Sequence, residues 1–232
     1  MKKYMSNLER LIKQEDITVD PLGLWSGGGT GQYLLQNFEG FEVPTQSPDS
    51  NLSFLLKNVE NINNGKVVEV GVFGGYVSLN LAKALKDKNT NVYSIDIWEN
   101  QTMDNGNMTY KGEVSQEYLD DAKHWFKHMR INFENIVKEL EYENLEIIQK
   151  PSLIAVNDFK DNEIDLIFID SDHSTEHVYN ELDSWLPKIK PNGVIIGDDF
   201  NDNRVRAAIE KFAKDRSLTF EVDSGRCWKV IK

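Results

Sequence analysis

Three aspartates follow apolar segments in the second half of the chain. The segment LIFID ends in Asp170, and the segment GVIIGDDF contains the adjacent pair Asp198 and Asp199. Continuous apolar runs of this kind are typical of buried parallel strands, whose carboxyl ends meet at one edge of a sheet. Carboxylate oxygens suit a hard cation such as Mg²⁺, so these aspartates are a candidate divalent-metal site. The alternative for the adjacent pair is a helix N-cap.

Histidines offer two further candidates for chemistry. His173 lies three residues after Asp170, and an imidazole with a pKa near 6.5 can accept a hydroxyl proton at neutral pH, which makes His173 a candidate general base. Its alternative is a structural role at the start of the next helix. His124 and His128 are spaced by one helical turn, as a metal pair would be, but no third ligand is evident nearby.

A glycine-containing stretch, KVVEVGVFGGYVS at residues 66–78, is typical of a buried strand, a tight turn and a helix start. Phe73 occupies the position at which a G-x-G-x-x-G nicotinamide loop has its second glycine. The spacing of Glu69, Gly71 and Gly75 fits the E-x-G-x-x-x-G loop of S-adenosylmethionine sites better. The alternative is a strand-to-helix crossover that binds no ligand.

An acidic residue ends the next predicted strand, at residues 91–96. Asp96 follows Gly75 at about the 20-residue spacing at which a second-strand acid reaches a nucleotide ribose. Its two oxygens can accept both ribose hydroxyls, although a cap or turn role is the alternative. Ile97 and Trp98 are then placed to cover one adenine face, and Ser152, after the third predicted strand, to touch the adenine edge.

Composition limits the class of protein. The chain has 232 residues and a formal net charge of -12, which suits one α/β domain and repels phosphate backbones, so no nucleic-acid partner is expected. The single cysteine, Cys227, cannot form an internal disulfide, and residues 1–16 carry charges where a secretory signal requires apolar residues. With no apolar run as long as a membrane span, a cytoplasmic enzyme without a membrane partner is expected.

The remaining segments are interpreted as follows. Residues 1–65 are expected to be a helical and loop extension that packs on the core, with a helix over residues 53–62 and a glycine-rich loop at residues 23–32. Residues 99–143 predict a lid insertion, a polar loop followed by a long helix. Residues 190–193 (KPNG) are expected to end a helix, and the last strands to form a hairpin around residues 224–225.

These residues together resemble the class I S-adenosylmethionine-dependent methyltransferases, specifically the metal-dependent O-methyltransferases that include the catechol and macrolide-sugar enzymes. The resemblance covers residues 66–232 and implies a Rossmann-like, doubly wound α/β fold. That fold has a mostly parallel seven-stranded sheet with an antiparallel C-terminal hairpin, here with N-terminal helices and a lid insertion. Ser171 departs from the family, whose members often have glycine at this position.

The resemblance also implies roles for residues of the site. The residues expected to bind the cofactor are Glu69, Gly71, Gly75, Asp96, Ile97, Ser152 and Asp170. Asp170, Asp198 and Asp199 are expected to bind Mg²⁺ or another divalent cation, and His173 with Asp170 to act in catalysis.

The implied reaction is methyl transfer from S-adenosylmethionine to a hydroxyl of a small-molecule acceptor, such as a sugar, a natural product or a diol, aligned by the metal. Two alternatives stay open at this point. An NAD-dependent oxidoreductase is favoured by Asp96 and opposed by Phe73 and the aspartates, and a non-catalytic module could keep the fold. Whether the chain forms a homo-oligomer is also left open.

Overall fold

The computed structural model describes residues 34–45, 49–98, 116–223 and 226–232. The chain divides into two compact units. The smaller unit comprises residues 1–46, 73–76 and 98–140, and the larger unit comprises residues 47–72, 77–97 and 141–232. The glycine-rich segment at residues 23–32 and the polar loop at residues 99–115 lie outside the described residues, so their predicted roles stay predictions.

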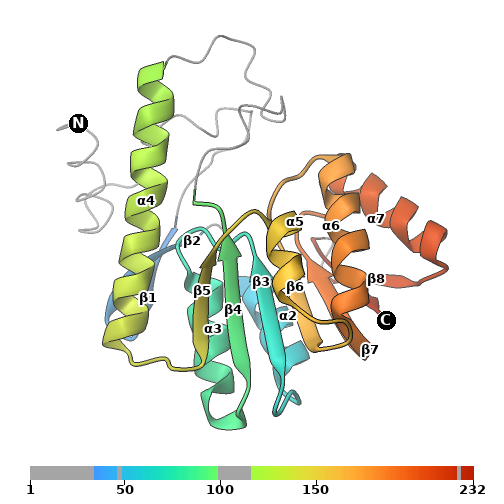
Figure 1. Cartoon of the computed structure of the whole chain (residues 1–232), viewed down its shortest axis with the longest axis horizontal. Coiled ribbons are helices and arrows are strands. Elements are labelled where there is room, and N and C mark those ends of the chain that lie inside the picture. The colour runs from blue at the N-terminus through green and yellow to red at the C-terminus, as the bar shows by residue number, and fades with distance from the viewer. Residues whose placement is uncertain (1–33, 46–48, 99–115, 224–225) are drawn as a thin grey trace. The chain divides into compact units, whose positions relative to one another are not determined.

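A seven-stranded sheet with the order β5-β4-β3-β6-β7-β9-β8 forms the centre of the larger unit (Figure 1). Its strands are β3 (Lys66–Val70), β4 (Asn91–Asp96), β5 (Leu145–Gln149), β6 (Ile164–Ile169), β7 (Ile189–Gly197), β8 (Phe220–Asp223) and β9 (Cys227–Ile231). The five strands β3 to β7 pair in parallel with their neighbours among one another. Strand β9 pairs antiparallel with both β7 and β8. The predicted fold class is therefore confirmed.

Helices cover both faces of this sheet. They are α2 (Asp49–Val59), α3 (Tyr76–Leu85), α5 (Ser152–Ala155), α6 (Thr175–Trp185) and α7 (Asn203–Arg216), with short 3₁₀ turns η1 (Lys86–Lys88), η2 (Val156–Asp158) and η3 (Leu186–Lys188). Val68 and Val70 of β3 share one buried cluster with side chains of α5, α6 and α7. Alternate residues face the other side, where Glu69 bonds Ser78 of α3. Because β3 is buried on both faces from Val67 to Val70, it suits its place between β4 and β6 in the sheet.

Strand β7 begins earlier than expected. Residues 190–193 belong to β7, and α6 ends at Trp185 before η3. The ladder between β6 and β7 jumps from the pair Ile164–Ile189 to the pair Leu166–Val194, so the KPNG segment bulges out of it. A proline that lacks an N–H and an asparagine with φ of 66° cannot continue a regular ladder, which explains the bulge.

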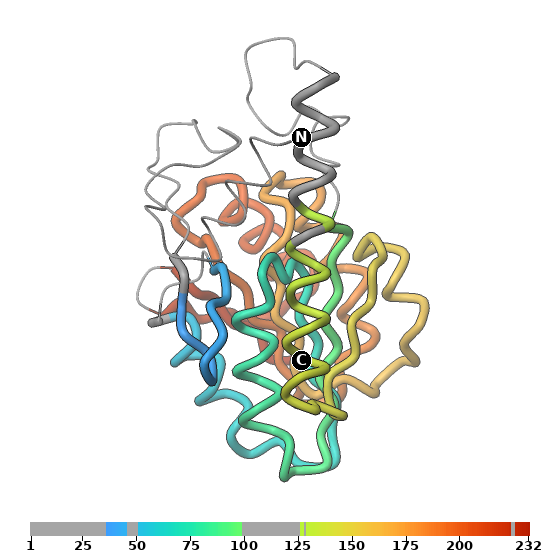
Figure 2. The backbone as a smooth tube through the Cα atoms, turned by 90° about the vertical axis from the view of Figure 1, so that its left-hand side faces the viewer, coloured from blue at the N-terminus to red at the C-terminus, as the bar shows by residue number. Residues whose placement is uncertain are grey.

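The described part of the smaller unit contains β1 (Leu34–Phe38), β2 (Phe41–Thr45) and α4 (Gln116–Glu139). Figure 2 traces the β1–β2 hairpin in blue and α4 in yellow-green. The hairpin was not predicted. Its two central residues, Glu39 and Gly40, have φ of 52° and 92°, as a type I′ turn requires. The predicted long helix is present as α4, although the side chains of His124 and His128 lie outside the described residues.

The described ranges include no helix that is both long and apolar enough to cross a bilayer.

Candidate active site

The glycine turn after β3 brings three strand ends together. Gly71 has φ of 86°, and its N–H donates to the carbonyl of Ile95 over 2.9 Å. The N–H of Val72 donates to Asp96 Oδ2 over 2.8 Å. A Cβ on Gly71 would lie 1.9 Å from the carbonyl oxygen of Asp170, so only glycine permits this approach of the ends of β3 and β6. The carboxyl ends of β3, β4 and β6 therefore form one compact edge.

Glu69 points into the core beside this edge. Its side chain is 2 % exposed, and Oε2 accepts a hydrogen bond from the hydroxyl of Ser78, which in turn lies 2.6 Å from the hydroxyl of Ser94. Burial raises the pKa of Glu69 well above its usual range, which favours the protonated acid relative to an exposed glutamate. The structure thus places this acid behind the glycine turn, in a polar cluster with two serines.

The predicted ribose and adenine residues lie at the carboxyl ends of β4 and β5. Asp96 makes the non-local bond to Val72 described above. The carbonyl of Ile97 accepts a bond from Gln149 Nε2 over 3.0 Å. Ser152 is buried at the start of α5, where its hydroxyl oxygen accepts from Trp185 Nε1 over 2.9 Å. Neighbouring strands therefore bring Asp96, Ile97 and Ser152 to the same sheet edge.

Gly75 and Trp98 belong to the smaller unit. Gly75 has φ of 88°, and a Cβ there would meet the ring of Phe133 at 2.2 Å. Trp98 is buried, and its indole N–H donates to the carbonyl of Phe73 over 2.9 Å. Gly75 is thus required by close packing against α4, independently of any cofactor.

Asp170, His173 and Asp199 form a compact cluster of ligand atoms. Each residue contributes one ligand atom, a carboxylate oxygen or an imidazole nitrogen, and these three atoms lie within 4.8 Å of one another. His173 Nε2 is 3.0 Å from Asp199 Oδ2. Among the residues that the structure describes, this metal-compatible group takes in His173 and leaves out Asp198. The sequence placed three aspartates in the group, whereas the structure groups two of them with the histidine.

Asp198 is fully buried and bound by other side chains. Its Oδ2 accepts from Asn51 Nδ2 over 2.6 Å and from Arg226 Nε over 2.9 Å, and its Oδ1 accepts from the N–H of Asp199 over 2.7 Å. Arg226 also lies 3.1 Å from Asp199 Oδ1. The helix cap that was the alternative role for the acidic pair is made by Asp202 at the start of α7.

The charges of this cluster shift its protonation equilibria. Burial, together with the negative charges of Asp198 and Asp199, raises the pKa of Asp170 to about 8. Burial is the largest single effect on His173 and disfavours its imidazolium, but the hydrogen bond to Asp199 and the negative charges of Asp199 and Asp170 together outweigh it and raise the pKa of His173 to about 9. Burial opposes ionisation of Asp199 as well, yet the bond from His173 lowers the pKa of that carboxyl. The His173–Asp199 pair is therefore ionic at neutral pH.

A second buried acid fixes the loop that carries Asp170 and His173. Ser171 Oγ donates to Glu181 Oε2 over 2.7 Å, and Glu181 of α6 is 0 % exposed. His177 Nε2 lies 3.2 Å from Glu181 Oε1. The departure from glycine at Ser171 thus has a structural partner on the following helix.

Three residues of this arrangement were missed at the sequence level: Asn51, Glu181 and Arg226. Asn51 lies in the polar first turn of a helix outside the segment that resembles the family, and nothing local marks it. Glu181 lies three residues after Val178, on the expected apolar face of its helix. An acid among apolar neighbours at this spacing could have indicated a buried carboxylate. Arg226 follows a predicted turn, where a charged residue is ordinary.

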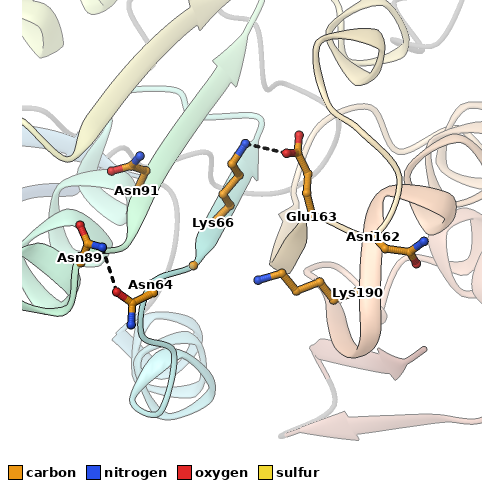
Figure 3. A pocket seen from close by; sticks show the side chains of 8 residues that line it. Asn64, Lys66, Asn89, Asn91, Asn162, Glu163 and Lys190 are labelled. Atoms are coloured by element: carbon orange, nitrogen blue, oxygen red, sulfur yellow. Dashed lines mark hydrogen bonds and ion pairs between the residues drawn. The ribbon is translucent and has the colours of Figure 1, made fainter.

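A separate pocket of about 420 Å³ lies at the opposite, amino-terminal edge of the sheet (Figure 3). It is lined by Asn64, Gly65, Lys66, Asn89, Asn91, Asn162, Glu163 and Lys190. Three of these asparagines, Asn64, Asn89 and Asn162, have positive φ, which is typical of turn residues. Lys66 pairs with Glu163 over 2.8 Å. Positive φ in turns accounts for these three asparagines. The pocket includes none of the predicted site residues.

Comparison with known proteins bears on the family. The family model described as a methyltransferase domain matches residues 68–200. Among curated proteins, an uncharacterised protein of Sinorhizobium fredii is 23% identical over 143 residues, which make up 61% of this chain and 13% of that protein. The chain thus spans only a small part of that relative's length.

Several solved structures share the fold. The O-methyltransferase NovP has a TM-score of 0.57 and 14% identity, with 78% of each chain covered. A suggested caffeoyl-CoA O-methyltransferase from Staphylococcus aureus has a TM-score of 0.56 and 17% identity, covering 82% of this chain and 86% of that one. A suggested methyltransferase from Streptococcus mutans, solved in complex with S-adenosylhomocysteine, has a TM-score of 0.53 and 10% identity, covering 81% and 99%.

The matched segment, residues 68–200, is more than half of the chain and runs from β3 to just beyond β7, so it contains the glycine turn, Asp96 and the Asp170–His173–Asp199 cluster. This chain therefore belongs to the methyltransferase domain family.

Proposed function

We propose that the protein transfers a methyl group from S-adenosylmethionine to a hydroxyl of a small-molecule acceptor, with a divalent cation at the acidic cluster. The observation that carries this proposal is the meeting of the Gly71 turn, Asp96 and the Asp170–His173–Asp199 cluster at one sheet edge. Methyl donor, ribose-binding acid and acceptor site must lie this close for a direct transfer. Family membership favours methyl transfer over the hydride-transfer alternative.

The cofactor side of the site fits S-adenosylmethionine. The proposed binding residues are Glu69, Gly71, Gly75, Asp96, Ile97, Ser152 and Asp170. Gly71 presents bare backbone at the strand end, which lets a ligand approach the main chain closely. The complex of the Streptococcus mutans relative with S-adenosylhomocysteine supports the same cofactor here. Bound S-adenosylmethionine would supply the methyl group to the acceptor oxygen and leave as S-adenosylhomocysteine, with the hydroxyl proton passing to solvent.

The acidic cluster fits a divalent cation, because two carboxylates and an imidazole bring one donor atom each within 4.8 Å of one another. A bound cation would supply Lewis-acid activation and orientation of the acceptor hydroxyl. Arg226 offsets part of the negative charge of Asp198 and Asp199. The predicted role of His173 as general base stays a prediction. With Nε2 bonded to Asp199 and a pKa of about 9, His173 must first give up a proton before it can accept one.

Calorimetric titration with S-adenosylmethionine, S-adenosylhomocysteine and NAD tests the cofactor. The two adenosyl compounds should bind and NAD should not. Incubation of a panel of sugars, catechols and other diols with methyl-labelled S-adenosylmethionine should then give a labelled O-methyl product by mass spectrometry, and the product should disappear after chelation. Binding of NAD without binding of either adenosyl compound would contradict the proposal, and full turnover after chelation would remove the cation from it.

A further inference from the structure

The carboxylate of Asp198 is bound by three donors of the protein. A carboxylate has about four lone-pair directions. Asn51 Nδ2 and Arg226 Nε donate to Oδ2 over 2.6 and 2.9 Å, and the N–H of Asp199 donates to Oδ1 over 2.7 Å. Arg226 Nε also lies 2.8 Å from Oδ1. A cation at Asp198 would therefore compete with these donors for a side chain that is 0 % exposed.

The neighbouring carboxylate, Asp199, is placed differently. Its Oδ1 is held by Arg226 at 3.1 Å, and its Oδ2 faces His173 Nε2 at 3.0 Å. Asp199 has φ of 59°, a left-handed conformation that is uncommon for residues other than glycine. The adjacent aspartates therefore share Arg226 but differ in their other side-chain partners, which are Asn51 for Asp198 and His173 for Asp199.

We propose that the metal ligands of this chain are Asp170, His173 and Asp199, and that Asp198 is a positioning residue locked by Asn51 and Arg226. This inference deepens the proposed function, on which it rests for the purpose of the cation. It assigns His173 to the metal rather than to proton transfer, and Asp198 to the support of Asp199 rather than to the metal.

The charges of the site balance under this assignment. Asp170, Asp198 and Asp199 carry three negative charges, which the guanidinium of Arg226 and one divalent cation offset in full when His173 is a neutral ligand. Buried charges require such pairing. An imidazole ligand also shifts the preference of the site from Mg²⁺ towards first-row transition ions. The structure therefore favours an ion such as Mn²⁺ or Co²⁺.

Asn51 extends the site beyond the segment matched by the family model. It lies on α2, before residue 68, and it is 1 % exposed. Its bond to Asp198 ties this helix to the end of β7. Arg226, which directly precedes β9, binds the same carboxylate. Asp198 is therefore held by one residue that precedes the matched segment in the sequence and by one that follows it.

Mn²⁺ binding tests this ligand assignment without any assay of methyl transfer. Loss of the electron paramagnetic resonance signal of free Mn²⁺ on titration gives the affinity. Electron spin-echo spectroscopy of protein with ¹⁵N-labelled histidine detects a directly bound imidazole. Wild-type protein should bind Mn²⁺ at least tenfold more tightly than Mg²⁺ and should show histidine nitrogen coupling. His173→Ala should lose the coupling and at least tenfold in affinity.

The adjacent aspartates provide a matched pair of variants. Asp199→Asn should weaken Mn²⁺ binding at least tenfold more than Asp198→Asn does, and Asp198→Asn should keep the histidine coupling. Thermal melting and S-adenosylhomocysteine binding report whether each variant is folded, and Asp87→Asn on the exposed turn η1 is the surface control.

Each outcome decides the matter. Absence of Mn²⁺ binding, absence of histidine coupling in the wild type, or an equal or greater loss in Asp198→Asn would overturn the ligand assignment. Adenosyl-cofactor binding with any of these results would leave the transferase proposal standing. Histidine-coupled Mn²⁺ without adenosyl-cofactor binding would support the ligand assignment and refute the transferase proposal.

Discussion

The Cα of Gly71 approaches the main chain of Asp170 so closely that a Cβ would stand 1.9 Å from the Asp170 carbonyl oxygen. The two residues end the neighbouring strands β3 and β6, and the N–H of Asp170 donates to the carbonyl of Val70 over 2.8 Å. The obstacle is backbone held in a sheet, so it cannot swing away as a side chain would. The glycine turn and the acidic cluster are thereby coupled through direct main-chain contact.

Gly71→Ala should lower the free energy of unfolding of the larger unit by more than about 2 kcal/mol, because the strain of a positive φ adds to the clash with Asp170. Gly40→Ala is a matched control, since Gly40 has φ of 92° and no atom within 4 Å of an added Cβ. Denaturant unfolding of both variants measures the difference. Equal decreases in the free energy of unfolding for the two variants would show that the contact with Asp170 adds nothing to the effect of the positive φ.

Asp96→Ala should weaken S-adenosylhomocysteine binding by roughly 10- to 100-fold, the usual worth of a charge-assisted hydrogen bond. The variant also loses the acceptor for the N–H of Val72, which loosens the glycine turn. Calorimetry provides the affinity, with Asp87→Ala on an exposed turn as the control. Unchanged binding by Asp96→Ala would mean that the ribose is held elsewhere.

The stability of the protein should depend on pH through Glu69. Because burial raises its pKa well above the usual range, the folded state binds this proton more tightly than the unfolded state does. The contribution of Glu69 to the free energy of unfolding is therefore full below about pH 4.5 and falls as pH rises towards the folded-state pKa.

Glu69→Gln replaces the ionisable carboxyl group with a neutral amide. Above about pH 4.5 the variant should gain stability relative to the wild type as pH rises, by at most about 1.4 kcal/mol per pH unit. Urea unfolding at several pH values tests this, with Glu146→Gln on the exposed side of β5 as the control. Parallel pH profiles for Glu69→Gln and the wild type would refute the prediction.

Ser171→Ala should lower the free energy of unfolding by about 1–3 kcal/mol, because the buried carboxylate of Glu181 loses its donor. Ser53→Ala, at an exposed position of α2, should change it by less than about 0.5 kcal/mol. Thermal or denaturant melts compare the two. A Ser171→Ala protein as stable as the wild type would show that another group satisfies Glu181.

Much of the fold was predictable because its signals are local. Apolar runs that end in acids identified β4, β6 and β7, an apolar run followed by a glycine turn identified β3, and the helical stripe of α4 was evident from its spacing. The hairpin of β1 and β2 was missed, although the Glu39–Gly40 turn with Asn37, whose Oδ1 accepts from the N–H of Gly40, is a local signal that could have found it.

The candidate site was predictable only in part. The spacing of Asp170, Asp198 and Asp199 indicated a shared sheet edge, but which carboxylate turns inward depends on a positive φ at Asp199 and on contacts with Asn51 and Arg226. These contacts join residues far apart in the sequence, and a single sequence offers no pattern for them. Local periodicity therefore locates the acids without assigning their partners.

The position of Asp198 between Asn51 and Arg226 has a consequence for synthesis on the ribosome. The bond from Asn51 closes a sequence separation of 147 residues, and the neutralising guanidinium follows Asp198 by 28 residues. Contacts that close long loops form late, and translation delivers β9 after every other strand of the sheet. A nascent chain that has already exposed β7 therefore carries an uncompensated carboxylate until Arg226 has left the exit tunnel, so completion of the sheet and neutralisation of the site are expected to occur in a single late step.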